Sequence, residues 1–318
     1  MISLVFLVYD SRSGSTYFSR KLDENTSDIV VTPEVNIEYA ARLVCAHGAG
    51  EDEVVSALER GRFFSSLGVN SSLVRQRKGE FGKKLLRNIV REALGVYCER
   101  RGKKNTSTVV IKKGNNLNVW RCLLDVFPES RFIYLRRDPR AVFSSKKRTR
   151  RPYYPEEFMG WAGVLWAARV WSRYEKNANR VANSGRMMMI RFEDLASREV
   201  YTFHSVCDWL GSTWGDDRCA AGGKGYFIAP KEREIHGKAL SSSVDRNAIE
   251  SWKGELNKFE VSVLEFLLKK SMSKAGYEVS LRSRLWGGLV VPIAVVDFLV
   301  RLLMKVKRVF FRKMGWWW

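Results

Sequence analysis

The chain has 318 residues, a formal net charge of +21 and a sequence pI near 9.9. Apolar residues make up 45 % of it, enough for the core of one large α/β domain with an appendage. The charge favours anionic partners such as nucleotides, acidic glycans, nucleic acid or anionic lipid. Five cysteines occur without a C-x-x-C pair, so we expect no zinc site and no disulfide framework, and the odd count suits a reducing compartment.

An apolar strand at residues 3–9 leads directly into a loop of small residues, Asp10-Ser-Arg-Ser-Gly-Ser-Thr16, and a helix is expected over 15–24. The free N–H groups and the positive dipole end of such a helix form an anion site. Gly14 lets the backbone approach the ligand, and the hydroxyl groups and Arg12 add donors. The loop lacks the G-K-[ST] of nucleotide-triphosphate loops, so we expect the anion to be held without a metal. With the strand starting so close to Met1, no signal peptide is expected.

Further strands and helices alternate along the chain, which predicts a P-loop-like α/β fold with a parallel sheet covered by helices on both faces. A Gly-rich loop region is expected over 211–240. The expected strands are 29–33, 108–112, 131–136 and 187–191, and the expected helices are 36–47, 51–60, 80–101, 116–126, 140–147, 156–182, 198–210, 245–252 and 258–274.

A second anion site is predicted where the strand 131–136 runs into Arg137-Asp-Pro-Arg140. The proline starts a helix, and Ser145 follows one or two turns later. Because the carboxyl ends of parallel strands lie along one edge of a sheet, both anion sites are expected at that edge. The predicted ligand therefore carries two separated phosphate-like groups.

Three segments in order carry a resemblance to a known family. Ser11-Arg-Ser-Gly-Ser-Thr-Tyr17, the Arg137-Asp-Pro-Arg-Ala-Val segment with Ser145, and Ile190-Arg-Phe-Glu-Asp-Leu195 resemble the sulfotransferases that use 3′-phosphoadenosine 5′-phosphosulfate (PAPS). The likeness covers roughly residues 1–280 and is greatest to the bacterial and carbohydrate-type branches. It implies transfer of a sulfuryl group from PAPS to an acceptor hydroxyl, with adenosine 3′,5′-bisphosphate (PAP) as the product and with no metal.

The resemblance also implies roles for individual residues. Arg12 stands where relatives carry a Lys or Arg that stabilises charge at the bridging oxygen. The pair that binds the 3′-phosphate in relatives corresponds to Arg137 and Ser145. The residues expected to bind PAPS are Arg12, Ser13, Gly14, Ser15, Thr16, Arg137 and Ser145.

The acceptor hydroxyl needs a base. We favour Glu34, which follows a short extended segment at the position where Glu-using relatives have theirs, although it could instead cap the next helix. Glu38 is the second choice, and none of the histidines directly follows a core strand. Relatives also have a lysine facing the sulfuryl group, so Lys112 or Lys113 is expected to share the stabilisation of charge. We prefer Lys112, because adjacent strand residues point to opposite faces.

We interpret some of the other charged residues as structural, and for others we leave two interpretations open. Arg136 and Arg140 are expected as surface charges, and Glu193 and Asp194 as caps of the helix 198–210. The basic run 146–151 is either a solvated face or a rim that attracts an acidic acceptor or membrane phosphates. His236-Gly-Lys238 and Ser241–Ser243 only loosely resemble the family's loop over the adenosine.

Residues 281–318 are expected to form a separate tail. Basic residues recur at helical spacing around Asp297, apolar residues lie between them, and the chain ends in Trp316-Trp-Trp318. This pattern favours a basic amphipathic helix at an anionic membrane surface. The alternatives are a helix packed on the domain or on a second subunit, and, least favoured because of the charges, a spanning helix.

Taken together, these features predict a sulfotransferase domain over 1–280 and a membrane-interface tail over 281–318. The enzyme is expected in the cytoplasm, peripheral on the inner face of a membrane. The acceptor stays open among a glycan, a lipid and a small alcohol, and an oligomer is possible. The alternative functions are a P-loop nucleotide kinase, which the missing G-K-[ST] disfavours, and a basic anion- or nucleic-acid-binding protein, for which no recognised nucleic-acid module is present.

Overall fold

The computed structural model describes residues 2–74, 79–103, 105–151, 154–215, 245–280, 291–304 and 306. The chain forms two compact units, each built from separate chain segments. Unit 1 comprises residues 1–9, 13–136 and 177–244, and unit 2 comprises 10–12, 137–176 and 245–318. The predicted domain boundary at residue 280 stays a prediction.

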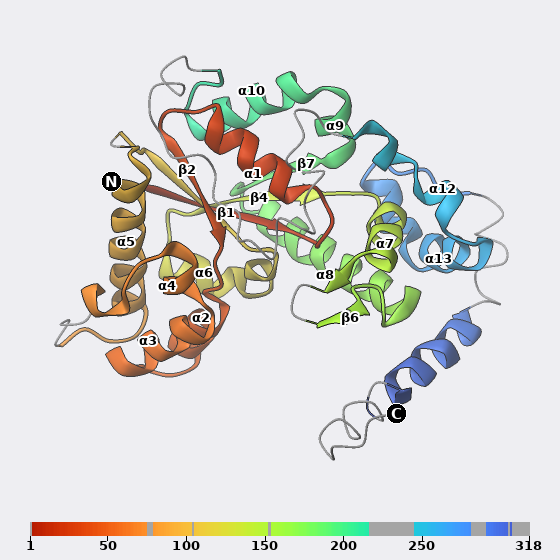
Figure 1. The fold of residues 1–318 in the computed structure, drawn as a ribbon, viewed down its shortest axis with the longest axis horizontal. Helices are drawn as coiled ribbons and strands as arrows, with labels where there is room; N and C mark the ends of the chain where they lie inside the picture. The colour runs from red at the N-terminus through yellow and green to blue at the C-terminus, as the bar shows by residue number, and fades with distance from the viewer. Residues whose placement is uncertain are drawn as a thin grey trace. The chain divides into compact units, whose positions relative to one another are not determined.

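Unit 1 contains a five-stranded sheet in the order β2-β3-β1-β4-β7, and every neighbouring pair is parallel (Figure 1). The predicted α/β fold with a parallel sheet is confirmed. Four strands have the predicted bounds, and β2 extends one residue further, to Glu34. The strands are β1 Ser3–Tyr9, β2 Ile29–Glu34, β3 Thr108–Lys112, β4 Arg131–Arg136 and β7 Met187–Arg191.

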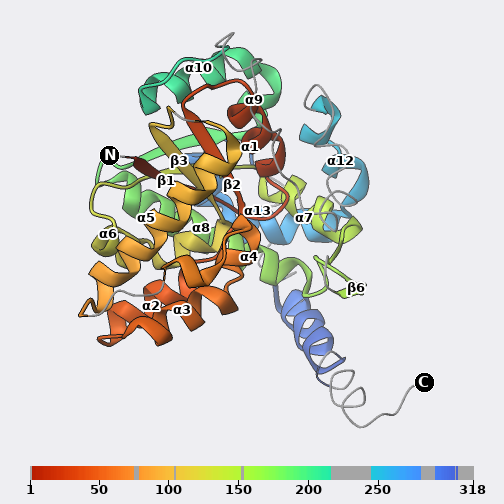
Figure 2. The ribbon, with the colours of Figure 1, turned by 60° about the vertical axis from the view of Figure 1, so that its left-hand side comes forward.

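Helices cover both faces of this sheet, which explains why its central strands read as continuous apolar runs. On one face, Val5 and Leu7 share a core with Phe18 of α1 and Phe203 of α10. On the other face, Phe6 contacts Phe127, just after α6. Helices α1, α9 and α10 lie together in both views, as do α2–α6 (Figures 1 and 2). The bounds are α1 Ser15–Glu24, α2 Glu38–Ala46, α3 Glu51–Arg60, α4 Phe63–Leu67, η1 Ser71–Val74, α5 Gly82–Arg101, η2 Gly114–Val119, α6 Trp120–Val126, α9 Phe192–Ser197 and α10 Glu199–Leu210.

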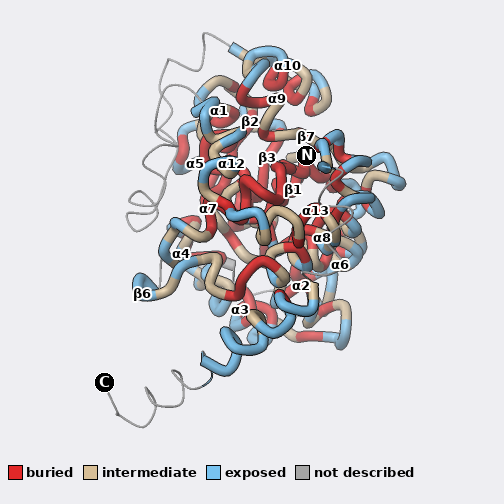
Figure 3. The backbone as a smooth tube through the Cα atoms, turned by 90° about the vertical axis from the view of Figure 1, so that its right-hand side faces the viewer, coloured by how far each residue is buried: buried red, intermediate tan, exposed pale blue. Residues whose placement is uncertain are grey.

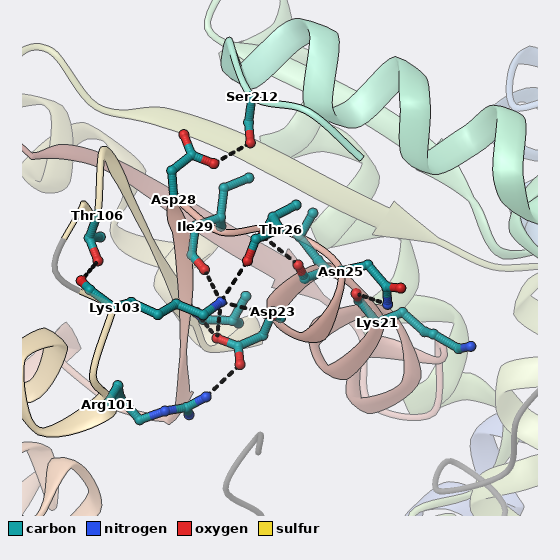
Figure 4. Close-up of polar contacts among 12 residues, drawn as sticks. Lys21, Asp23, Asn25, Thr26, Asp28, Ile29, Arg101, Lys103, Thr106 and Ser212 are labelled. Atoms are coloured by element: carbon teal, nitrogen blue, oxygen red, sulfur yellow. Dashed lines mark hydrogen bonds and ion pairs between the residues drawn. The ribbon is translucent and has the colours of Figure 1, made fainter. Parts of the chain in front are cut away.

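A buried ionic cluster, here called the Asp23 cluster, lies at the end of α1 and the start of β2 (Figure 4). Asp23 pairs with Arg101 at 2.5 Å, and its side chain is only 1 % exposed. The Lys103 ammonium donates to the main-chain carbonyl oxygens of Asp23, Thr26 and Ile29. These bonds compensate the buried charges and tie the loop between α1 and β2 to the end of α5.

Unit 2 begins with α7, which packs on α12 and α13. Its core includes Phe143 of α7, Trp171 of α8 and Leu264 of α13. The bounds in this part of the chain are α7 Pro139–Arg148, β5 Arg150–Arg151, β6 Tyr154–Phe158, α8 Gly163–Ala182, η5 Arg246–Ile249, α12 Trp252–Glu255 and α13 Lys258–Lys274. The last residues of α8 belong to unit 1.

The predicted helix over 156–182 is wrong at its start. Residues Tyr154–Phe158 form β6, which pairs antiparallel with β5, and α8 begins only at Gly163. Gly163 has a φ of 77°, a conformation that separates the hairpin from the helix and suits glycine. The aromatic residues at both ends of β6 suit a strand, although the expected helix began at residue 156 and so included the second of them, Phe158.

The expectation that Arg136 and Arg140 are surface charges is also wrong. Both are buried, and Arg140 bonds to Asp138 and to Glu265 of α13. Its guanidinium lies 4.0 Å from the ring centroid of Trp252. Arg140 therefore joins α7 to α12 and α13 in the interior of unit 2.

Residues 291–304 of unit 2 are helical, and most of their side chains are exposed (Figure 3). Ala294 is buried in the core of unit 2, and Phe298 stacks on Trp166 of α8 at 6.3 Å between ring centroids. Among the described residues, no helix is both long and apolar enough to cross a membrane. Much of the predicted tail, including Arg282, Arg284 and Trp316–Trp318, lies outside the described residues.

Candidate active site

The loop after β1, where the anion site is predicted, leads into the N-terminus of α1. Gly14 is the N-cap residue and has a φ of 84°, and no side chain of the described residues caps the first turn of α1. Ser13, Ser15 and Thr16 are buried there. A methyl group added at Gly14 would lie 2.6 Å from Cδ2 of Phe192, so only glycine fits between the loop and α9. The N-terminus of α1 thus presents main-chain N–H groups and hydroxyls together.

The two lysines that end β3 point to different partners in unit 1. Lys112 is 1 % exposed, and its ammonium donates to the Thr16 hydroxyl at 3.1 Å. Lys113 pairs with Glu34 at 2.6 Å. The structure therefore brings Lys112 to the anion loop and Lys113 to the carboxylate favoured as the base. The opposite directions follow from strand alternation.

Glu34 is held by hydrogen bonds to both of its carboxylate oxygens. Tyr9, the last residue of β1, donates its hydroxyl to Oε1 at 2.7 Å, and Lys113 donates to Oε2 at 2.6 Å. Burial would raise the pKa of Glu34, but the charges of Lys113 and Lys112 and these hydrogen bonds lower it from its ordinary 4.5 to about 2. Glu34 is thus a fixed carboxylate at neutral pH.

In unit 2, Arg12 has a strained backbone, and its side chain makes a hydrogen bond. Its φ of 74° places a non-glycine residue in the left-handed region, a conformation that recurs at functional sites. Its Nε donates to the Ser145 hydroxyl of α7 at 3.0 Å. Burial, together with the charge of Arg148, lowers the pKa of the guanidinium. Arg12 and Ser145, predicted from separate motifs, are therefore in direct contact.

Arg137 fixes the main chain around the same loop. Its two terminal nitrogens donate to the carbonyl oxygens of Arg12 at 2.6 Å and of Ala248 at 2.5 Å. Its own carbonyl oxygen accepts from the indole of Trp171 at 3.0 Å. Arg137 thus ties the main chain at Arg12 and at Ala248 to the start of α7.

The basic run 146–151 is only partly a solvated face. Lys146 is buried and pairs with Asp10 at 2.6 Å. The Asp10–Lys146 pair holds the start of the loop in unit 2, and the sequence reasoning missed it because it counted Lys146 with its exposed neighbours. Other members of the run have acidic partners, namely Glu260 for Lys147, Glu255 for Arg148 and Glu157 for Arg151.

A sequence model described as "Sulfotransferase family" matches residues 5–216, about two thirds of the chain. The chain belongs to the sulfotransferase family. The resemblance predicted from three segments is confirmed, and with it the enzyme class, because members of this family transfer a sulfuryl group from PAPS to a hydroxyl acceptor.

Solved structures of bacterial sulfotransferases share the fold. The sulfotransferase domain from the curacin biosynthetic pathway matches with a TM-score of 0.56 at 16 % identity, covering 88 % of this chain and 99 % of that one. The sulfotransferase domain of the Synechococcus PCC 7002 olefin synthase matches with a TM-score of 0.55 at 12 % identity, covering 88 % and 96 %. No protein of curated function matches the sequence.

The other residues considered for the site of the sulfotransferase have surroundings that point less clearly to a role in the reaction. Glu38 pairs with Arg42 one turn along α2, and His47 and His204 are exposed. Glu193 and Asp194 lie in the first turn of α9. His236, Lys238 and Ser241–Ser243 lie outside the described residues. The sequence reasoning missed Tyr9, whose only signal was its place at the carboxyl end of β1.

Proposed function

We propose that this sulfotransferase moves the sulfuryl group of PAPS to a hydroxyl group of a glycan or a glycolipid at a membrane surface. The transfer from PAPS is supported by the hydrogen-bond donors that lie at the ends of the strands. In unit 1 these are the N–H groups of α1, the hydroxyls of the loop and Lys112, and in unit 2 they are Arg12, Arg137 and Ser145. Such a donor set suits a co-substrate with two phosphate groups.

In the proposed reaction the acceptor oxygen attacks sulfur in line while the bond from sulfur to the phosphate oxygen breaks. Arg12 and the N-terminus of α1 stabilise the charge that develops on the phosphate oxygen. Lys112, fixed by Thr16, stabilises the equatorial oxygens of the transferred group. Ser13 and Ser15 bind the 5′-phosphate side, and Arg137 and Ser145 bind the 3′-phosphate. The side chains and the helix end neutralise the charge, and we expect turnover without an added metal.

Glu34 takes the proton of the acceptor hydroxyl. Tyr9 and Lys113 fix the direction of its carboxylate, and its low pKa keeps it ionised, as a base must be. A carboxylate with a pKa near 2 is a weak base, so it accepts the proton only as the bond from oxygen to sulfur forms and the hydroxyl becomes acidic.

The two lysines of β3 give a matched test. Lys112→Met should lower the affinity for PAP about tenfold or more, because a charge-assisted contact to the co-substrate is lost. Lys113→Met should leave that affinity unchanged, since Lys113 serves Glu34. Calorimetric titration with PAP measures both, and transfer from labelled PAPS to a mixture of glycolipids measures turnover. Equal affinities in the two variants would refute the assignment of Lys112.

The membrane part of the proposal rests on the helix at residues 291–304. The side that faces unit 2 carries Ala294, Asp297, Phe298 and Arg301, spaced as one face of a helix. Gly163 lies against Asp297 and Arg301. Asp297 and Arg301 are 38 % and 45 % exposed, and most of the remaining surface of this helix is apolar, unlike that of a helix made for water. The exposed apolar side chains are Ile293, Val295, Val296, Leu299, Val300, Leu302, Leu303, Met304 and Val306.

An anionic bilayer is the occupant proposed for this apolar face. The sequence on either side of the helix supplies Arg282, Arg284, Lys305, Lys307 and Arg308, which complement anionic headgroups. The described cysteines, Cys45, Cys98, Cys122 and Cys207, are free thiols, as suits the cytoplasmic face of a membrane. A membrane-bound acceptor would then meet the enzyme at that surface.

Vesicle flotation tests the attachment. Wild-type protein should float with vesicles that contain phosphatidylglycerol, and the double variant Leu299→Glu, Leu303→Glu should stay at the bottom of the gradient. The control places the same charges at the exposed Val200 and Tyr201 of α10. Flotation of the Leu299, Leu303 variant at the wild-type level would refute the attachment, whereas unchanged PAP affinity would show that it still folds.

A further inference from the structure

A cavity of about 350 Å³ opens in unit 2, and its lining contains none of the residues assigned to the reaction. It is lined by Lys147 of α7, Glu156, Glu157 and Phe158 of β6, the following Gly160 and Trp161, and Arg301 and Met304 of the C-terminal helix. Its volume falls in the range of small-molecule sites, roughly 300–1,000 Å³. We propose that this cavity binds the headgroup of a zwitterionic phospholipid, in which a phosphate is joined to an ammonium group.

The charges of the lining favour a ligand that carries both signs. Two cations, Lys147 and Arg301, and two carboxylates, Glu156 and Glu157, share the cavity. An anion alone would meet the carboxylates, and a cation alone would meet the lysine and the arginine. A phosphate bound by the cations, with its ammonium group near the carboxylates, satisfies both.

Ion pairs hold the charged side chains at the cavity. Lys147 pairs with Glu260 at 2.7 Å, Glu157 with Arg151 at 2.6 Å, and Arg301 with Asp297 at 2.8 Å. Arg301 makes its bond through Nε, so its two terminal nitrogens keep a geometry suited to two phosphate oxygens. The positions of these groups are therefore set before any ligand arrives, which lowers the entropy cost of binding.

Aromatic side chains add a preference for an ammonium group. Trp161 and Phe158 line the cavity together with the two glutamates, and Phe158 belongs to the same strand as they do. The Phe158 ring already has the Arg150 guanidinium 4.6 Å from its centroid. A tryptophan face next to carboxylates is a favourable site for a quaternary or primary ammonium, through cation–π attraction. Trp161 is thus the residue expected to distinguish a zwitterionic lipid from an anionic one.

The apolar end of the ligand has a path out of the cavity. Met304 lines the cavity and is 61 % exposed, and the neighbouring Leu303 and Val300 are exposed on the same helix. Acyl chains that leave the cavity at Met304 would enter the bilayer on the apolar face of this helix. This inference rests on the proposed membrane attachment and adds a specific lipid contact to it.

The test uses monomeric short-chain amphiphiles, so that the cavity is measured apart from the bilayer. Full-length protein is titrated calorimetrically with diheptanoylphosphatidylcholine, with diheptanoylphosphatidylglycerol, which lacks the ammonium, and with an alkyltrimethylammonium salt of comparable chain length, which lacks the phosphate. We expect the zwitterion to bind about tenfold more tightly than either of the others. Equal affinities for all three would overturn the proposal and leave only apolar binding.

Variants locate the binding. Trp161→Ala and Glu156→Gln should each weaken binding of the phosphatidylcholine several-fold, and Lys147→Met should do the same through the phosphate. The controls are Trp209→Ala, a tryptophan of α10 that contacts Arg131, and Glu250→Gln, an exposed carboxylate outside the cavity. Unchanged affinity in all three cavity variants would overturn the assignment, even if the zwitterion binds.

Parallel measurements separate this proposal from the others. PAP affinity and flotation with anionic vesicles are recorded for the same samples. Selective phosphatidylcholine binding without PAP binding would leave the cavity assigned and the co-substrate site refuted. Flotation without selectivity among the three amphiphiles would retain membrane attachment and refute the headgroup site.

Discussion

The Asp23 cluster and the Glu34–Lys113 pair, both in unit 1, join a carboxylate to lysine or arginine, but they differ in access to solvent. In the Asp23 cluster the side chains of Asp23, Arg101 and Lys103 are 1 %, 7 % and 11 % exposed. In the pair at the carboxyl ends of β2 and β3, Glu34 and Lys113 are 27 % and 26 % exposed. The chemistry is alike, but water and ligands reach only the second pair.

This difference indicates separate roles for the two clusters. Lys103 donates to three main-chain carbonyl oxygens, and Asp23 and Arg101 are buried, so a substrate does not reach the Asp23 cluster. Glu34 is held at both oxygens by side chains alone, and each carboxylate oxygen can accept a further bond. We therefore expect changes in the first cluster to alter stability and changes in the second to alter turnover.

The largest effect is expected for Asp23→Asn. It removes the carboxylate that compensates the buried charge of Arg101 and lies 3.8 Å from Lys103, which typically costs about 3–5 kcal/mol of unfolding free energy. Urea denaturation measures it, and turnover per folded molecule should not change. The control is Asp125→Asn, whose partner Lys83 is 45 % exposed, where a loss of at most about 1 kcal/mol is expected. A loss no larger than that of the control would mean that the cluster is not a structural anchor.

Glu34→Gln should lower turnover and leave stability nearly unchanged, which is the opposite of the effect expected for Asp23→Asn. The amide keeps the shape and can still accept from Tyr9 or Lys113, so the unfolding free energy and the PAP affinity should change little. Turnover should fall by about 10²–10⁴ if Glu34 is the base. Glu38→Gln, which removes only an exposed pair with Arg42, is the matched control. Similar turnover in the two variants would remove Glu34 from the mechanism.

The smallest effect, a shift in pH dependence, is expected for Lys113→Met. In wild-type protein the lowered pKa of Glu34, about 2, keeps the base ionised, and turnover through this group is lost only as the pH falls through that value. The stabilisation linked to Glu34 follows the same sign, being present above its unfolded pKa and lost as the pH falls toward 2.

Without Lys113 the pKa of Glu34 loses the largest effect that lowers it, although the Lys112 charge and the Tyr9 hydrogen bond remain, so it should rise from about 2 toward its ordinary value. The acid limb of the pH–rate profile should then move upward. Steady-state rates in constant-ionic-strength buffers measure the shift, with Lys83→Met as a control for an exposed lysine. An acid limb that stays in place would show that the base is a different group.

Sequence reasoning recovered the sheet because its strands are uniform apolar runs that end in short polar loops. It also predicted Arg12 and Ser145, which the structure brings into contact, from motifs that depend on local strand-to-helix geometry. It missed Tyr9 and the Asp10–Lys146 pair, because both depend on contacts between segments distant in the chain. The burial of Arg140 was hidden for the same reason, since its partner Glu265 lies 125 residues away.

The hairpin formed by β5 and β6 before α8 shows a second limit of predicting structure from the sequence. Residues Tyr154–Phe158 read Tyr-Pro-Glu-Glu-Phe, a segment too short for its pattern to separate a strand from the first turn of a helix. Pairing with β5 decides the outcome, and β5 itself is only two residues long. Local propensity gives no signal for such a pairing, although the hairpin supplies much of the lining of the cavity in unit 2.

The way unit 2 is assembled has a consequence for how the chain folds as it is synthesised. Its segments are residues 10–12, 137–176 and 245–318, so its core forms only after the ribosome has released α13, whose Leu264 packs with Phe143 and Trp171. Until then Arg140 lacks Glu265 and the apolar side of α7 is uncovered. A nascent chain halted after the family match, at residue 216, would present that surface to chaperones, whereas the strands of unit 1 would already be complete.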